Sequence, residues 1–133
     1  MTDSSGYFTT MLAGQSLNTS FIDTGSNGYF FDSATIPNCS GGAGAGFYCP
    51  GAVVNMSATL VGANAMSSVV SFSIDNAVTL FADASKVVLP TLSGPMDDAS
   101  SFDWGLPFFY GRRVFIGIDG QASSLGTGPF YAF

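Results

Sequence analysis

The stretch Phe21-Ile22-Asp23-Thr24-Gly25-Ser26-Asn27-Gly28 decides how the rest of the chain is interpreted. An apolar, strand-like run delivers one carboxylate, Asp23, into a tight turn, and the two glycines of the turn allow close backbone approach. The hydroxyls of Thr24 and Ser26 and the turn amides can hydrogen-bond ionised Asp23, which lowers its pKa. Alternatively, Asp23 can share a proton with a second carboxylate, which raises one pKa of the pair. The stretch predicts a chemical site and leaves both alternatives open.

Aromatic and aliphatic runs around this stretch predict a β-rich chain. We expect a hairpin from residues 7–12 and 17–22, and a central strand at 29–31, which is too continuously apolar to have a solvated face. Further strands are expected at residues 77–81, 87–89, 114–118 and 130–133, the last of them an edge strand. One short helix is expected near Pro107 to Tyr110, because Pro107 suits a first helical turn and Gly111 suits a helix end.

The clearest hairpin spans residues 54–61 and 66–74, where apolar side chains recur at every second position. Its turn consists of Gly62, Ala63, Asn64 and Ala65. The hairpin is either a plain core hairpin or a flap over a cleft, and its small, polar tip suits both interpretations equally.

The composition restricts the possible chemistry. A chain of 133 residues is long enough for one core, so we expect a single domain over residues 1–133. The chain has no His and no Glu, so it cannot form imidazole-based triads or zinc sites, and aspartates must do any acid–base work. We expect no cofactor and no metal. A net charge of −6 with only three cations argues against nucleic acid and against an anionic membrane surface as partners.

Cys39 and Cys49 bracket a Gly-rich loop and are too few for a four-thiolate metal site. We expect them to form a disulfide, which favours an extracytoplasmic, periplasmic or secreted location. The surrounding loop, residues 33–52, is unusually long for a compact domain unless it is stapled or functional. No signal peptide is visible at the start of the sequence.

Three other aspartates invite comparison with Asp23. Asp97 and Asp98 are adjacent in a polar segment where neighbouring side chains diverge, so a solvated acidic loop is expected rather than a paired-carboxylate site. Asp103 stands in an otherwise apolar stretch and needs hydrogen-bond partners if it is buried. Arg112 or Arg113 is a candidate partner, and an exposed Asp103 is the favoured alternative.

Two motifs carry a resemblance to a known family. Asp23-Thr24-Gly25-Ser26, preceded by an apolar pair, resembles the active-site motif of the aspartic peptidases. Residues 104–115 resemble the glycine (here Gly105), short helix and strand that close each lobe of pepsin-like folds. The resemblance implies an all-β fold: a single pepsin/retropepsin-like aspartic-peptidase lobe, closed and barrel-like, with one short helix. It also implies that Thr24 braces two lobes and that Ser26 holds the outer oxygen of Asp23.

Within that superfamily the chain is most similar to the C-terminal half of an uncharacterised bacterial family of secreted, two-lobed, pepsin-like proteins. Residues 21–31, 46–50 and 102–109 carry this likeness. Asp103 departs from the pattern, which normally has two apolar residues before its glycine. The hairpin tip has no tyrosine, which suits a C-terminal lobe. Because the likeness begins abruptly at Gly6, an excised lobe of a longer protein is expected.

The resemblance implies a hydrolase mechanism in which two carboxylates share one proton around a water. Each lobe supplies one Asp, so Asp23 is expected to act on a peptide substrate opposite a second copy or a missing N-terminal lobe, and the isolated monomer is expected to be inactive. The alternative is a non-catalytic secreted β domain, either a peptide-binding lobe or a surface-assembly subunit, that keeps the motif as scaffold. A glycosidase would need two carboxylates about 5–9 Å apart, and no second Asp is convincingly placed for that role.

Overall fold

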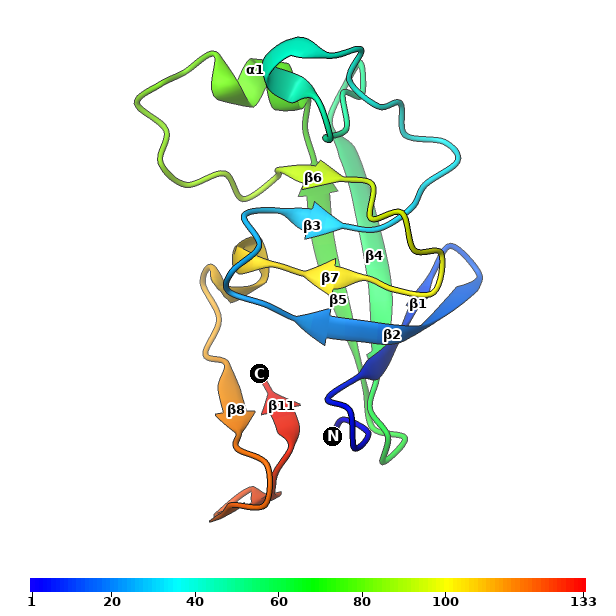
Figure 1. The fold of residues 1–133 in the computed structure, drawn as a ribbon, viewed down its shortest axis with the longest axis vertical. Helices are drawn as coiled ribbons and strands as arrows, with labels where there is room; N and C mark the ends of the chain where they lie inside the picture. The colour runs from blue at the N-terminus through cyan, green and yellow to red at the C-terminus, as the bar shows by residue number, and fades with distance from the viewer.

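The computed structural model describes residues 1–133 and shows a domain made almost entirely of β-strands (Figure 1). Seven strands form one mixed, nearly closed, barrel-like sheet. Across the sheet the order is β5 (Ser67–Ile74), β4 (Val54–Val61), β1 (Phe8–Leu12), β2 (Gln15–Ile22), β7 (Asp103–Trp104), β3 (Tyr29–Phe30) and β6 (Ser93–Gly94). In Figure 1 the strands β2, β7, β3 and β6 cross in front of the long β4–β5 hairpin, so the sheet folds back on itself.

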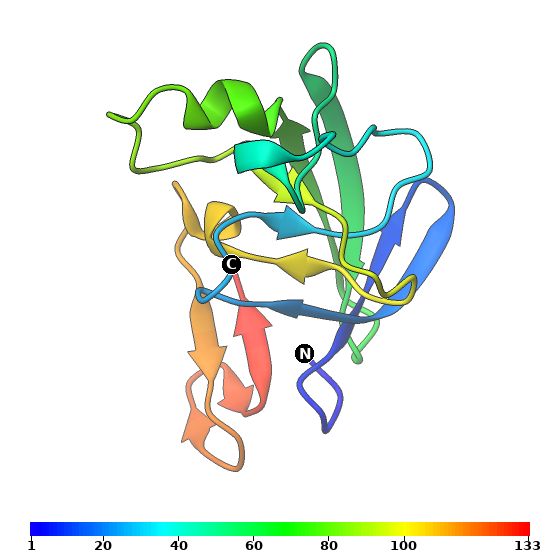
Figure 2. The same cartoon turned by 45° about the horizontal axis from the view of Figure 1, so that its top comes forward.

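The remaining elements are short. Strand β8 (Phe115–Gly117) pairs with β11 (Phe130–Ala132), and β9 (Ala122–Ser123) pairs with β10 (Gly126–Thr127). The turned view of Figure 2 shows these strands as an arm beside the main sheet. One α-helix, α1 (Ala77–Phe81), and two 3-10 turns, η1 (Gly42–Gly44) and η2 (Leu106–Phe109), complete the structure. The expected all-β class is therefore confirmed, but the one α-helix is α1 and not the segment near Pro107, where the sequence predicted the short helix.

Stacked aromatic rings form the centre of the core. Phe102 and Trp104 alternate with Asp103, so both point to the same face of β7, and their ring centroids lie 4.1 Å apart. Phe31 stacks on Phe102 at 4.7 Å, and Phe72 from the long hairpin packs edge-on against both Phe102 and Trp104. Because these rings come from three parts of the chain, their packing fixes the two halves of the sheet against each other.

Strand β2 is the element that delivers Asp23. Its first part pairs antiparallel with β1, and its last two residues pair in parallel with β7, with Phe21 opposite Asp103. The backbone of Asp23 continues this pairing, since its N–H donates to the carbonyl of Trp104 at 3.3 Å. Asp23 therefore stands at a fixed height at the end of a strand that is held on both sides.

Both expected hairpins are present. Strands β1 and β2 form the first, and β4 and β5 form the second with eight paired positions from Val54↔Ile74 to Val61↔Ser67. The expected central strand at 29–31 is also found as β3, which has β7 on one side and β6 on the other. The short helix expected near Pro107 to Tyr110 is the 3-10 turn η2, and the strands expected at 114–118 and 130–133 are β8 and β11.

Two expected strands are wrong. Residues 77–81 form the helix α1, because Asn76 caps it: the Asn76 side chain accepts from the Thr79 N–H at 3.2 Å. The buried residues Ala77 and Leu80 are three positions apart, which is helical spacing, and they pack with Leu92. Residues 87–89 form no strand, and Val87 is 92% exposed. No other strand pairs with residues 87–89, so these apolar residues join no ladder of backbone hydrogen bonds.

The disulfide between Cys39 and Cys49 is confirmed, with 4.8 Å between the two Cα atoms. The long loop that it closes is also held by Tyr48, whose phenol donates to the Phe31 carbonyl at 2.5 Å, and by Asn76, which donates to the Pro50 carbonyl at 3.3 Å. The loop is therefore stapled against both the core and the start of α1.

Candidate functional site

Each carboxylate oxygen of Asp23 has a donor. Oδ1 accepts from the Gly25 N–H at 2.7 Å, and Oδ2 accepts from the Ser26 hydroxyl at 3.1 Å. The residue is partly exposed, so it can meet solvent or a ligand. Donors to both oxygens stabilise the ionised form. The turn amide and the Ser26 hydroxyl therefore hydrogen-bond Asp23 as the sequence suggested, and a second carboxylate also lies nearby.

The turn that carries these donors is closed by the segment after β7. The Leu106 N–H donates to the Ser26 carbonyl at 2.7 Å. Gly105 leaves room for this approach, because a β-carbon there would lie 2.8 Å from the Ser26 carbonyl oxygen and would collide with that of Gly28. Gly105 therefore allows the turn to pack this closely because it has no side chain. Thr24, in the same turn, is exposed.

Asp103 is the second carboxylate of the site. It is 5% exposed, and its Oδ2 is in a short hydrogen-bond contact with the Ser26 hydroxyl, the same group that reaches Asp23. Its Oδ1 is buried and has no hydrogen-bond partner. The pKa of Asp103 is raised to about 6: burial is the largest cause and the charge of Asp23 adds to it, while the Ser26 hydrogen bond acts in the opposite direction.

The expectations for Asp103 are corrected by this geometry. The favoured prediction of an exposed Asp103 is wrong. Asp103 points away from the aromatic core and is covered by residues 23–28, which we call the Asp23 turn. The candidate arginine partners are wrong as well. Arg112 instead donates to the Phe108 carbonyl at 2.7 Å, and its guanidinium lies 4.8 Å from the centre of the Phe108 ring. Arg113 is exposed. Arg112 therefore contacts Phe108 of η2, whereas Asp103 contacts Ser26 of the Asp23 turn.

Tyr131 on β11 is a further member that the sequence did not suggest. Burial raises the pKa of its phenol, and the negative charge of Asp23 raises it too, although the Ile22 backbone acts in the opposite direction. The phenol therefore keeps its proton and lies near enough to Asp23 to sense its charge. The only sequence signal for Tyr131 is its place in the expected terminal strand, which does not reveal what that strand contacts.

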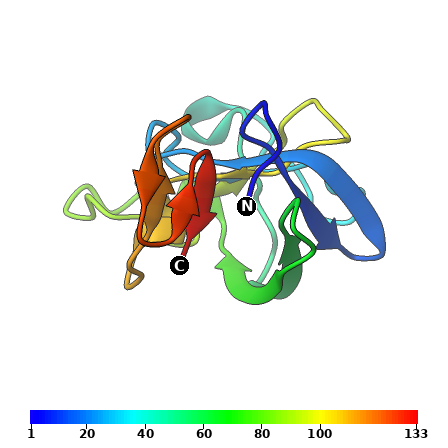
Figure 3. The ribbon, with the colours of Figure 1, turned by 90° about the horizontal axis from the view of Figure 1, so that it is seen from below.

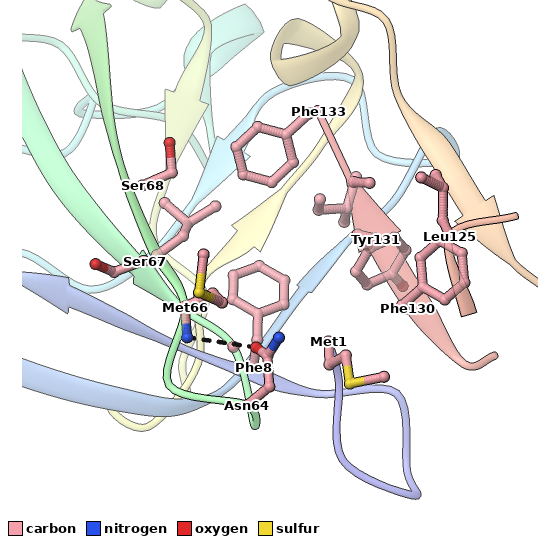
Figure 4. A pocket seen from close by; sticks show the side chains of 14 residues that line it. Met1, Phe8, Asn64, Met66, Ser67, Ser68, Leu125, Phe130, Tyr131 and Phe133 are labelled. Carbon is pink, nitrogen blue, oxygen red and sulfur yellow. Dashed lines mark hydrogen bonds between the residues drawn. The ribbon is translucent and has the colours of Figure 1, made fainter. Parts of the chain in front are cut away.

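A cavity of about 380 Å³ lies beside this end of β2 (Figure 4). Its lining includes Phe8, Ile22, Phe130 and Tyr131 together with the tip of the β4–β5 hairpin. Figure 4 shows Met66 and Asn64 across the opening from Tyr131 and Phe133. The cavity is mainly apolar, and Asp23 stands next to its lining rather than within it.

The long hairpin belongs mostly to the core, and its tip lines the cavity. Ala58, Leu60, Val70 and Phe72 of the hairpin are buried core residues, so most of it is a core hairpin. Of the four turn residues, Gly62 and Asn64 line the cavity, whereas Ala63 and Ala65 are exposed and do not. Figure 3 shows the tip near the N-terminus, and the Ala63 N–H donates to the Met1 carbonyl at 2.9 Å.

The other sequence candidates lie away from this site. Asp97 and Asp98 are exposed, and Asp98 accepts hydrogen bonds from Ser100 and Ser101, which lower its pKa. No group of three or more His, Cys, Asp or Glu side chains with the geometry to hold a metal ion is found. No helix has both the length and the apolar character needed to cross a membrane.

The comparisons with known proteins identify a family. The family described as "Protein of unknown function (DUF3443)" matches residues 1–133, so the chain belongs to this family. No curated protein and no solved structure matches the chain.

Proposed function

We propose that this chain is one lobe of a pepsin-like aspartic peptidase, in which Asp23 supplies one of the two carboxylates that activate a water for hydrolysis of a peptide bond. The observation that carries the proposal is the setting of Asp23 at the end of β2. One of its oxygens accepts from a backbone N–H and the other from the Ser26 hydroxyl, while the residue remains open to solvent. This arrangement orients a carboxylate toward an external partner.

Asp103 does not supply the second reacting carboxylate. It is 5% exposed and lies behind Ser26, so a water held between Asp23 and Asp103 would have no path to a peptide. The second carboxylate therefore comes from a second copy of the chain or from another lobe. With it, one carboxylate accepts a proton from the water while the other donates a proton to the peptide carbonyl. The apolar cavity beside Ile22 and Tyr131 suits an uncharged peptide side chain.

The location is part of the same proposal. The disulfide between Cys39 and Cys49 supports an oxidising, extracytoplasmic setting, because such bonds rarely persist in the cytosol.

The test is hydrolysis of a fluorescence-quenched peptide library between about pH 3 and pH 8, at chain concentrations that span the monomer–dimer range found by light scattering. If two copies form the site, activity will rise with the square of concentration at the low end. Excess Asp23→Asn chain will suppress it, because mixed dimers hold one carboxylate. Asp97→Asn is the matched control and leaves activity unchanged. Activity from a monomer, or activity that survives in Asp23→Asn alone, contradicts the proposal.

A second candidate is a non-catalytic secreted β domain that binds another chain. The observation in its favour is a run of exposed apolar residues in and just after β8, where Phe115, Ile116 and Ile118 are 54%, 59% and 69% exposed. Scattered single apolar residues are normal on a surface, but three in one short segment favour a partner. Under this candidate Asp23→Asn leaves partner binding intact, whereas Ile116→Ser weakens it.

A further inference from the structure

We propose that Asp103 is a positioning residue for Asp23: it holds a proton that fixes the Ser26 hydroxyl as a hydrogen-bond donor to Asp23. The catalytic meaning of this arrangement rests on the proposed function, whereas the hydrogen-bond chain itself does not. The chain runs from the Asp103 carboxylic acid through the Ser26 hydroxyl to Asp23 Oδ2.

The argument begins with the proton count at Ser26. Its Oγ lies 3.1 Å from Asp23 Oδ2 and in short contact with Asp103 Oδ2. A serine hydroxyl has one proton and two lone pairs. If both carboxylates were ionised, the hydroxyl would donate to one of them, and its oxygen would face the other with no proton between two acceptors. A single proton on Asp103 Oδ2 resolves this conflict, because Asp103 then donates to Ser26 and Ser26 donates to Asp23.

The surroundings place that proton on Asp103 rather than on Asp23. The second oxygen of Asp23 accepts from the Gly25 N–H at 2.7 Å, which stabilises the carboxylate form. The second oxygen of Asp103 is buried without a partner, which is costly for a charged oxygen and less so for the carbonyl of a neutral acid. The direction of the pKa shift agrees, since burial raises the pKa of Asp103 to about 6.

No cation opposes this assignment. Asp103 lies on β7, between β2 and β3. The ionisable residue at the end of β2 is Asp23, and the one on β3 is Tyr29, which interacts with Arg112. Arg112 follows η2 and is bound to the carbonyl and the ring of Phe108. On β11 the neighbour is Tyr131, which is near Asp23. The one ion pair of the structure joins Lys86 and Asp83, which lie in the exposed loop after α1.

The proton on Asp103 makes the state of Asp23 depend on pH. While Asp103 is neutral, the Ser26 hydroxyl is committed to Asp23. When Asp103 ionises, the single hydroxyl proton is shared between two carboxylates and a second negative charge stands beside Asp23. Asp23 then loses a fixed hydrogen-bond donor. The site is therefore arranged for use below the pH at which Asp103 loses its proton.

The experiment is a carbon-13 NMR titration of the aspartate carboxyl groups in the 133-residue chain, which needs no substrate. In the wild type, Asp103 is expected to titrate well above the ordinary Asp range of about 3.9. The Asp23 signal is expected to show an inflection at that same pH. Asp103→Asn keeps a donor to Ser26 at every pH, so the inflection of Asp23 disappears. Ser26→Ala removes the link and the inflection is lost or much reduced.

Asp97→Asn is the matched control, because Asp97 is an exposed aspartate distant from the Asp23 turn, and both titrations should be unchanged in it. Thermal unfolding shows whether each variant is folded, and Ser26→Ala keeps the test decisive if Asp103→Asn does not fold. The proposal is overturned if Asp103 titrates in the ordinary range, or if the Asp23 inflection persists in folded Asp103→Asn or is undiminished in Ser26→Ala.

The activity assay separates this proposal from the proposed function. If the chain is a peptidase, Asp103→Asn should raise the ratio of activity at about pH 7 to that at about pH 5 by about tenfold, because roughly a tenth of Asp103 stays neutral one unit above its pKa. No hydrolysis at concentrations where the chain is dimeric, together with the expected titrations, refutes a peptidase built from two copies and leaves the hydrogen-bond chain standing. Hydrolysis with an unchanged pH ratio refutes the role of Asp103 and leaves the peptidase standing.

Discussion

Gly105 lies so close to the carbonyl oxygen of Gly28 that no side chain fits between them. The contact joins the end of β7 to the end of the Asp23 turn, and the Leu106 N–H bonds to the same turn. The φ angle of Gly105 is −64°, so its need for glycine comes from space and not from backbone conformation.

Gly105→Ala should therefore destabilise the fold by about 3 kcal/mol, the upper part of the range for overpacking a filled site. The measurement is the free energy of unfolding in urea. Gly51→Ala is the matched control, because a β-carbon there meets no atom within 4 Å, and its stability should stay near that of the wild type. Equal effects of the two substitutions would contradict the close-approach explanation.

Thr10→Val should cost about 1–3 kcal/mol, the penalty for leaving a buried donor unpaired. The Trp104 indole N–H donates to Thr10 Oγ1 at 3.0 Å, and both residues are fully buried. Val keeps the shape of Thr and removes only the acceptor. Because the chain has one Trp, its fluorescence during urea unfolding reports on this residue directly. Thr10→Ser keeps the hydroxyl and should cost less than Thr10→Val; the reverse order would show that packing outweighs the hydrogen bond.

The stability of the chain should fall as pH rises through the titration of Asp103. Its pKa is raised from 3.8 to about 6, so the folded state holds a proton that the unfolded state releases. The favourable contribution is complete below about pH 4 and is lost above about pH 6, and a shift of about two units corresponds to ~3 kcal/mol. Asp103→Asn has no such loss. As pH rises from about 4 to about 7, the unfolding free energy of the variant relative to the wild type should therefore increase by ~3 kcal/mol.

Urea unfolding at several pH values from about 4 to about 7 measures that difference. Asp83 and Asp98, whose pKa values are lowered by serine hydrogen bonds, act in the opposite direction, but they do so equally in both proteins. A difference that stays constant with pH would show that Asp103 titrates alike in the folded and unfolded chain.

Loss of the disulfide should destabilise the chain by about 2–3 kcal/mol, because a loop of this size gains freedom in the unfolded state. The double substitution Cys39→Ser and Cys49→Ser, compared with the wild type in urea, provides the measurement. The intact mass under non-reducing conditions should show no free thiol in the wild type. The variant should also weaken the packing of α1, since Cys39 contacts the small cluster of Ala77, Leu80 and Leu92. Unchanged stability would mean that the loop is held by Tyr48 and Asn76 alone.

The strands around Asp23 were predictable because their signals are local. Alternating apolar residues and small turn residues identify the two hairpins, and the apolar run before Asp23 identifies β2. The helix α1 was missed because five mostly apolar residues are compatible with a strand as well as with a helix. The contact that favours the helix is the hydrogen bond from the Thr79 N–H to the Asn76 side chain. The sequence does show Asn76 three residues before Thr79. It does not show that Ala77 and Leu80 pack together against Leu92, which is what makes the helical spacing favourable.

The candidate site was predictable only in its first carboxylate. Asp103 alternates with Phe102 and Trp104, so the sequence does indicate that it faces away from their side of the strand. The sequence does not indicate that the Asp23 turn covers that opposite face, because the cover depends on β7 pairing in parallel with β2. Tyr131 was missed for the same reason, since its place beside Ile22 at the cavity depends on tertiary packing and has no local pattern.

The parallel pairing of β2 with β7 also has a consequence for the order in which the molecule folds. Ser26 and Asp103 are 77 residues apart in the chain, and the loop between them must close before the Asp23 turn has its cover. Contacts of such high sequence separation form late and slow the folding of small domains. The two hairpins can form while the chain is still being synthesised. The oriented carboxylate appears only after β7 and Gly105 have emerged, so a ribosome-bound fragment that ends before them carries Asp23 without its site.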